Sequence, residues 1–170
     1  MTKKLSSVSR ALDRFVEAIG RTVSLLVLVI IAIVSLEMVL RFVFNRPTPW
    51  AHELSAWFQV ALVFLGGGYA FNKGQFVRID VVHMRMSPRA KAIVDLTLGS
   101  VLLGLFAGAM IWHGTDLAWQ SFRMGEVSAT GGWSGPVFIA KGLVPLGGIL
   151  LVMAWISHML KQLVILFEPE

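Results

Sequence analysis

The sequence predicts an all-α integral membrane protein with four transmembrane helices. Long apolar stretches lie near residues 21–44, 51–71, 92–116 and 136–166. A bilayer core about 30 Å thick needs ~20 mostly apolar helical residues to cross it, and each stretch is long enough. The chain is 56% hydrophobic with a mean hydropathy of +0.73, well beyond a normal soluble domain. Since four spans leave little room for anything else in 170 residues, we expect a single membrane domain over residues 1–170.

The first 20 residues predict an amphipathic helix. Apolar residues recur there at three- and four-residue steps: Leu5, Val8, Leu12, Phe15, Val16 and Ile19. Charged residues take the other side: Lys4, Arg10, Asp13, Arg14 and Glu17. A basic amphipathic helix beside a span normally lies in the membrane interface. We therefore expect an interfacial helix, with a short cytosolic extension of the first span as the alternative. The apolar run that follows is too long for a signal peptide and lacks a cleavage site, so we expect it to be retained.

Prolines mark the predicted ends of the spans, and small residues form a stripe within the third span. Pro47 and Pro49 end the first span and fix an extended turn, and the second span is expected to start near Ala51. The third span carries small residues at four-residue steps: Ser100, Gly104 and Gly108. Small residues in one stripe let another helix approach closely, so this stripe predicts helix packing, within the chain or with a partner. The fourth span is expected to begin at Pro136.

The distribution of basic residues predicts the orientation. Cytoplasmic segments collect Lys and Arg. Two basic segments lie two crossings apart: Lys3, Lys4, Arg10, Arg14 and Arg21, and then Lys73, Arg78, Arg85, Arg89 and Lys91. Both termini and the middle loop, which also carries Asp80, are therefore expected in the cytoplasm. The net charge of +5 comes from these span-flanking clusters, so we expect contact with membrane lipids and not with nucleic acid.

Glu37 is the sharpest candidate for chemistry, because it lies inside the first span. Ionisable groups within spans are costly and are usually paired or functional. Arg41 follows at i+4, the favourable order for a helical ion pair. We expect a structural pair of Glu37 and Arg41. A proton or cation site at Glu37 is the alternative.

Four residues near the predicted outer surface are candidates for contact with a periplasmic partner. They are Trp50, His52, Glu53 and Glu126. An acid near the start of a helix also favours the positive helix N-terminus, so Glu53 has a purely structural reading as well.

Catalytic and cofactor motifs are missing from the sequence. Cysteine is absent, which excludes thiolate chemistry. Four scattered histidines, His52, His83, His113 and His158, show neither metal-ligand spacing nor a haem arrangement. The triplet Gly66–Gly68 lies in a span and lacks the lysine of a phosphate-binding loop. We expect no enzyme activity and no cofactor in this chain.

Three sets of residues carry a family resemblance. They are Arg41–Asn45 with Pro47, Trp50 and Glu53; then Val77–Val81 in the basic loop; then Glu126–Ser128, Pro136 and Val144–Gly147. In this order they resemble the patterns R-[YF]-x-F-N…W…E, h-V-R-h-D and E-x-S…P…h-P-h-G. These patterns are typical of the small membrane subunit, the DctQ type, of tripartite ATP-independent periplasmic (TRAP) transporters. Gly131–Gly135 departs from the more apolar approach to Pro136 expected in that family.

The resemblance implies a role in the bacterial inner membrane. Such systems import organic anions, usually carboxylates, by means of a sodium gradient. A periplasmic binding protein (DctP type) captures the substrate, and a large permease subunit (DctM type) holds the substrate and sodium sites. The small subunit would scaffold the large one and help to dock the binding protein. The alternative is a self-contained small homodimeric transporter with Glu37 as its coupling acid.

Overall fold

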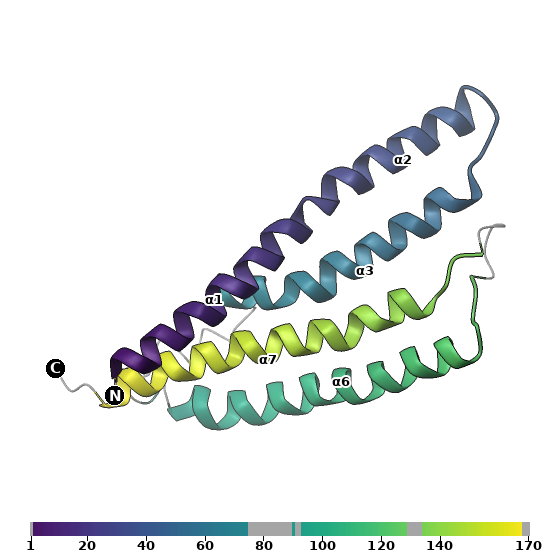
Figure 1. Ribbon diagram of the computed structural model, residues 1–170. Coiled ribbons are helices and arrows are strands. Elements are labelled where there is room, and N and C mark those ends of the chain that lie inside the picture. The colour runs from purple at the N-terminus through teal and green to yellow at the C-terminus, as the bar shows by residue number, and fades with distance from the viewer. Residues whose placement is uncertain (1, 75–89, 91–92, 129–133, 168–170) are drawn as a thin grey trace.

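A computed structural model describes residues 2–74, 90, 93–128 and 134–167, which are almost entirely helical. Its elements are α1 (Thr2–Ser24), α2 (Leu26–Phe42), α3 (Pro49–Asn72), the π-helical turn η1 (Asp95–Gly99), α6 (Ser100–Arg123) and α7 (Phe138–Phe167) (Figure 1). Four helical stretches are long and apolar enough to cross a membrane: Ser6–Phe42, Pro49–Asn72, Leu96–Arg123 and Phe138–Gln162. The prediction of four membrane-spanning helices is confirmed. The orientation with both termini in the cytoplasm stays a prediction.

Helices α1 and α2 run on in nearly the same direction as one long rod (Figure 1). Only a turn at Leu25 separates them, where Leu25 N–H donates to the Thr22 carbonyl and Leu28 N–H to the Leu25 carbonyl. The break between α1 and α2 therefore lies at Leu25, inside the stretch 21–44 that was predicted as the first span.

Helix α1 packs against both α3 and α7 with a face that only partly overlaps the predicted apolar stripe. Val16 is fully buried, and Ser9 is buried beside it. Val8 and Phe15 belong to the predicted apolar stripe, yet both stay half exposed. The helix thus has one mixed face for the bundle and one apolar face for lipid, which is compatible with the predicted interfacial position.

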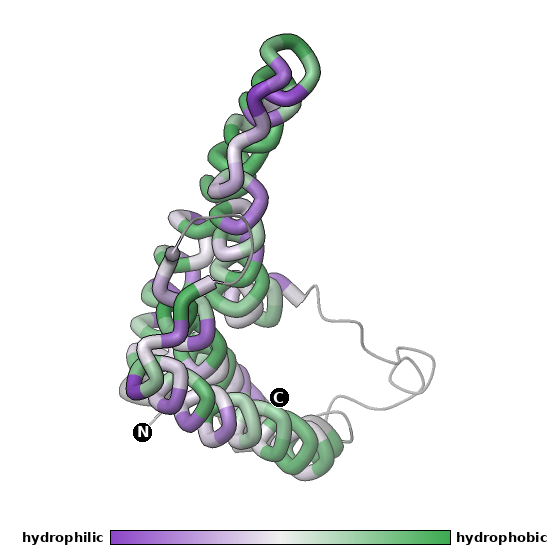
Figure 2. Tube along the Cα trace, turned by 90° about the vertical axis from the view of Figure 1, so that its right-hand side faces the viewer, coloured by the Kyte–Doolittle hydropathy of each residue, from purple (hydrophilic) through white to green (hydrophobic). Residues whose placement is uncertain are grey.

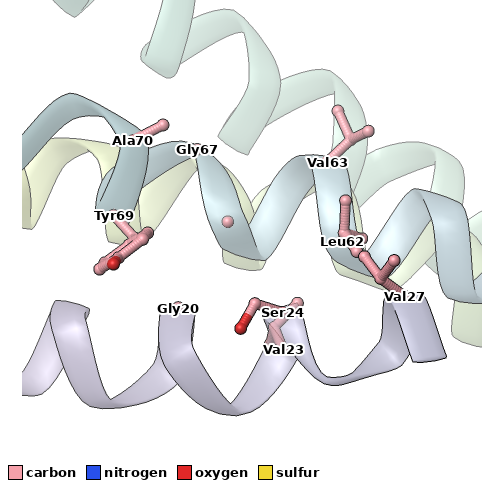
Figure 3. A pocket seen from close by; sticks show the side chains of 10 residues that line it. Gly20, Val23, Ser24, Val27, Leu62, Val63, Gly67, Tyr69 and Ala70 are labelled. Carbon is pink, nitrogen blue, oxygen red and sulfur yellow. The ribbon is translucent and has the colours of Figure 1, made fainter. Parts of the chain in front are cut away.

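Close approach between α3 and α7 depends on glycine. A Cβ atom at Gly68 would lie 2.9 Å from the carbonyl oxygen of Leu150, and one at Gly147 would lie 2.6 Å from that of Phe64. The small core gathers around this contact: Val16, Phe71, Ala107, Leu151 and Ala154. Gly20 of α1 meets Tyr69 of α3 in the same way (Figure 3).

Helix α6 packs on α7 through residues seven positions apart. Ala107, Gly114 and Ser121 are buried, and a Cβ atom at Gly114 would lie 2.9 Å from Pro145 Cδ. Seven residues are nearly two whole turns of a helix, so this set drifts by only about 20° per step.

The predicted stripe of Ser100, Gly104 and Gly108 is not the face that meets α7. Cβ atoms at Gly104 and Gly108 would meet no described atom within 4 Å, whereas Ser100 Oγ lies 3.7 Å from Met159 Sδ of α7. Four residues turn a helix by about 400°, so the stripe rotates by about 40° at each step. Only Ser100, the first residue of the stripe, therefore contacts α7.

Hydrophobic residues make up much of each helix (Figure 2). Large exposed side chains on α2 and α6 include Leu28, Ile31, Met38, Leu105, Phe106 and Trp112. Helix α2 contacts α3 and, slightly, α1. In Figure 1 the α2–α3 hairpin stands apart from the α6–α7 hairpin at their connected outer ends. Apolar surface of this extent is expected for helices whose solvent is lipid.

Candidate functional site

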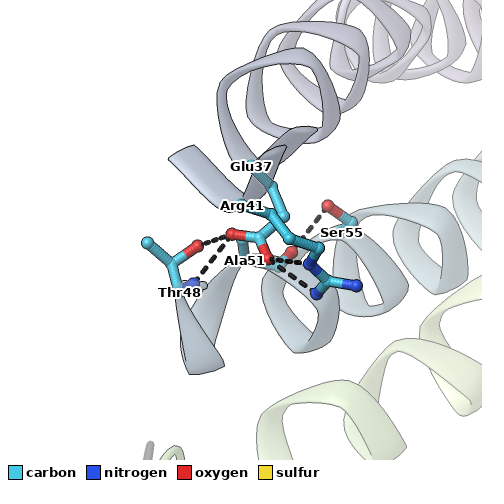
Figure 4. A network of polar contacts seen from close by, with 5 residues as sticks. All are labelled: Glu37, Arg41, Thr48, Ala51 and Ser55. Carbon is cyan, nitrogen blue, oxygen red and sulfur yellow. Dashed lines mark hydrogen bonds and ion pairs between the residues drawn. The ribbon is translucent and has the colours of Figure 1, made fainter. Parts of the chain in front are cut away.

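The carboxylate of Glu37 joins the end of α2 to the start of α3 (Figure 4). Arg41 donates to Oε1 from Nη2 at 2.7 Å and from Nε at 3.1 Å. Thr48, immediately before α3, donates to Oε2 from its backbone N–H at 2.9 Å and also from its hydroxyl group. Glu37 is 9% exposed, so this carboxylate is almost completely enclosed by its donors.

The turn between the two helices brings Thr48 back to Glu37. Asn45 has a φ of 49°, a left-handed conformation that asparagine tolerates better than most residues. The next N–H, that of Arg46, donates to the carbonyl of Leu40 at 2.9 Å. Pro49 then occupies the first turn of α3, where its missing N–H costs no hydrogen bond. Sequence reasoning found the ion pair by its spacing but missed Thr48, whose role depends on this turn.

Hydrogen bonds occupy all the acceptor positions of the Glu37 carboxylate, which limits its ability to bind a proton or cation. An ionised carboxylate offers about four acceptor positions. Arg41 and Thr48 supply four donor contacts, two to each oxygen. A transported proton or cation would have to displace some of these donors. The geometry is that of a structural junction between two helices.

The structure divides the residues predicted to meet a periplasmic partner. Trp50 and His52 are exposed at the start of α3, and Glu126 is partly exposed in the α6–α7 connection. Glu53 is only 8% exposed, and its Oε2 atom has no hydrogen-bond partner among the described residues. A partner cannot reach Glu53 directly in this structure. The reason is helical rotation, which turns Glu53 away from the exposed side chain of His52.

Glu126 anchors the connection between α6 and α7. Its Oε2 atom lies 2.5 Å from Nζ of Lys141, and this hydrogen bond lowers the pKa of Glu126. A β-bridge pairs Val127 with Pro136, and Val137 N–H donates to the carbonyl of Glu126. Helix α7 therefore begins at Phe138, two residues later than predicted, because Pro136 belongs to the bridge.

A second set of charges, which sequence reasoning missed, ties the C-terminal half of α1 to the end of α3. Oε1 of Glu17 accepts from Arg21 Nη2 at 2.8 Å and from Lys73 Nζ at 2.7 Å. The hydrogen bond to Glu17 raises the pKa of Lys73. The i, i+4 spacing of Glu17 and Arg21 was a usable signal, whereas Lys73 lies 56 residues from Glu17 and required the fold.

Helix α7 joins the middle of α1 through Asp13. Lys161 Nζ lies 2.6 Å from Asp13 Oδ2. Ser157 Oγ lies 2.6 Å from Asp13 Oδ1 and 3.1 Å from the carbonyl oxygen of Ser9. These contacts span more than 140 residues of sequence, and no local pattern predicts them.

Two predicted positions lie outside the described residues. Arg78 and Asp80 of the cytoplasmic loop fall within residues 75–89. Across the part of the chain that the structure describes, no group of three or more His, Cys, Asp or Glu residues is placed to hold a metal ion.

Comparison with known proteins identifies the family. The sequence profile of the DctQ component of tripartite ATP-independent periplasmic transporters matches residues 30–164. The chain belongs to this family. A candidate TRAP transporter small permease protein of Haemophilus influenzae is 25% identical over 156 residues, which cover 89% of this chain and 94% of that protein. The resemblance predicted from the sequence motifs is confirmed, and the chain is a multi-pass membrane component of a TRAP transporter.

Proposed function

We propose that this chain is the scaffolding subunit of a sodium-driven TRAP transporter that imports organic anions, usually carboxylates, across the bacterial inner membrane. Its partners are a large permease of the DctM type and a periplasmic binding protein of the DctP type. The large permease carries the substrate and sodium sites. Family membership supports the proposal, as does the small number of charges within the spans.

The main support for the scaffolding role is the face of α6 that points away from α7, which exposes small residues. Gly104 and Gly108 are exposed there, and their Cβ positions are open. Leu105 and Trp112 are exposed nearby, Trp112 to 77%. Helices in membranes associate through close packing at small residues, because lipid supplies no hydrophobic drive. We assign this face to the large permease.

The bonding of Glu37 favours a scaffold over a self-contained transporter. A coupling acid must exchange its proton or cation during each cycle. Glu37 is instead held by Arg41 and Thr48 at a junction that fixes the α2–α3 hairpin. Exposed Trp50, His52 and Glu126 lie toward the outer ends of the two hairpins, where we place the docking surface for the binding protein.

Co-expression with the large permease tests this role. Gly104→Leu should lower the amount of large permease that co-purifies with the chain. Because the Cβ position of Gly104 is open, the variant chain expressed alone should keep the helical content of the wild type. Gly142→Leu on α7 is the matched control, since its Cβ position is also open, and it should leave co-purification unchanged.

Transport by the chain alone would contradict the proposal. If the purified protein forms a stable homodimer that takes up an organic anion in liposomes without the large permease, it is a transporter in its own right. Loss of that uptake in Glu37→Gln would then establish Glu37 as the coupling acid.

A further inference from the structure

An apolar groove lies between α3 and the rod formed by α1 and α2 (Figure 3). Its volume is about 330 Å³, and its walls include Val23, Val27, Leu62 and Val63. Along α1 and the start of α2 it extends from Gly20 to Val27, a length of about 10 Å at 1.5 Å per residue.

Glycines explain why the two helices separate here. At the inner end, a Cβ atom at Gly20 would lie 2.2 Å from Tyr69 Cβ, so the helices are in full contact. Farther along α3, Cβ atoms at Gly66 and Gly67 would meet no described atom within 4 Å. The missing side chains of these two glycines leave the space that forms the groove.

Basic side chains edge the inner end of the groove. Arg21 follows Gly20, and Lys73 lies one helical turn beyond Tyr69. Both donate to the same oxygen of Glu17, so two positive charges and one negative charge leave a net charge of +1. The side chains of Arg21 and Lys73 are 71% and 44% exposed, and each keeps further N–H donors for another acceptor.

We propose that the groove and its basic edge bind one anionic phospholipid. An acyl chain lies along Val23, Val27 and Leu62, and the phosphate accepts hydrogen bonds from Arg21 and Lys73. The charge matches the anionic headgroups of the cytoplasmic leaflet, which attract basic residues near the surface. The bound lipid fills the space between α1 and α3 and holds the amphipathic helix against the bundle.

The size of the groove favours an acyl chain over a helix from a partner. A helix is about 10 Å across, so a 10 Å length of it occupies roughly 800 Å³. Even with its open mouth counted, the empty space of the groove is about 670 Å³, less than such a helix needs. A single flexible hydrocarbon chain leaves no backbone group to satisfy, and the side chains that line the groove are apolar except for those of Ser24 and Tyr69.

Lipid titration of the full chain in detergent, followed by native mass spectrometry, tests the proposal. Phosphatidylglycerol should bind about fivefold tighter than phosphatidylcholine with the same acyl chains, the discrimination expected from about one net charge at the surface. Gly67→Leu should weaken binding of both lipids, because its side chain enters the groove without a clash at Cβ. Arg21→Gln should remove the preference for phosphatidylglycerol but keep the binding of phosphatidylcholine.

Matched variants elsewhere on the surface serve as controls. Gly104→Leu has an equally open Cβ position, and Arg123→Gln removes an exposed charge at the end of α6. Both should bind the two lipids like the wild type. Equal affinity of the wild type for the two lipids would overturn the proposal, and so would unchanged lipid binding in Gly67→Leu. If Gly67→Leu keeps its lipid but loses the large permease, the groove is a protein contact and the lipid assignment is wrong.

Discussion

Gly147 should be a position where the bundle tolerates an added methyl group poorly. It lies where α7 crosses α3, and a Cβ atom there would meet three atoms of Phe64: the carbonyl oxygen at 2.6 Å, Cβ at 2.7 Å and the carbonyl carbon at 2.9 Å. Two of these atoms are backbone, so they cannot move aside by a change of side-chain rotamer. Gly147→Ala must push the two helices apart.

The expected cost follows from comparison with a second glycine of the same helix. Overpacking a well-packed contact costs about 1–3 kcal/mol. Replacing glycine by alanine in a helix interior also gains up to ~1 kcal/mol of helix propensity, which offsets part of that cost. Gly142→Ala makes the same gain in α7, and its Cβ position is open. The propensity term cancels between the two variants, so Gly147→Ala should be less stable than Gly142→Ala by about 1–3 kcal/mol.

Reversible unfolding in mixed micelles, followed by circular dichroism, measures this difference. Both variants should keep the native helical content before the transition, because the substitution leaves the helices themselves intact. If the two unfolding free energies agree within about 0.5 kcal/mol, the size of an ordinary surface substitution, then α3 and α7 are not in backbone contact at Gly147.

Two further predictions concern charges. Glu37→Gln should lower the unfolding midpoint and the yield of the assembled complex, because it removes the carboxylate that accepts hydrogen bonds from Arg41 and Thr48. Sodium-dependent uptake per assembled complex should persist. An intact complex that has lost sodium coupling would refute the structural assignment. Lys141 lowers the pKa of Glu126, so the stability from this pair is present above the unfolded-state pKa of about 4.3 and is lost as the pH falls through the folded value. Unfolding midpoints of wild type and Glu126→Gln should therefore differ at neutral pH and converge in acid; a gap that persists in acid would contradict the pairing.

The four spans were predictable because a run of ~20 apolar residues is rare outside a membrane-spanning helix. Their ends were less predictable. The third span was expected to stop at Asp116, yet α6 continues to Arg123. Gln120 donates to Asp116 at 2.9 Å from one turn later, so the polar residue is accommodated inside the helix. Hydropathy marks where a helix leaves an apolar environment, which is not where the helix ends.

The spacing of charges along the sequence predicted a polar contact within one helix but not those between helices. The pair of Glu37 and Arg41 lies at i, i+4, and helix geometry alone brings the two side chains together. Asp13 and Lys161 meet only because α1 packs along the far end of α7. Such a contact depends on the register between two helices, which the sequence of neither helix specifies.

The small residues of α6 also show that the sequence does not specify which face of a helix packs against a neighbouring helix. From sequence alone, Gly104 and Gly108 looked like the packing stripe, whereas the structure gives the contact with α7 to Ala107 and Gly114. A helix that only served its own bundle would need one such face. Here a second run of small residues stays open on an adjacent face of the same helix. Because small residues in membranes promote close helix contact, we propose that α6 packs on two sides, against its own bundle on one and against the large permease on the other.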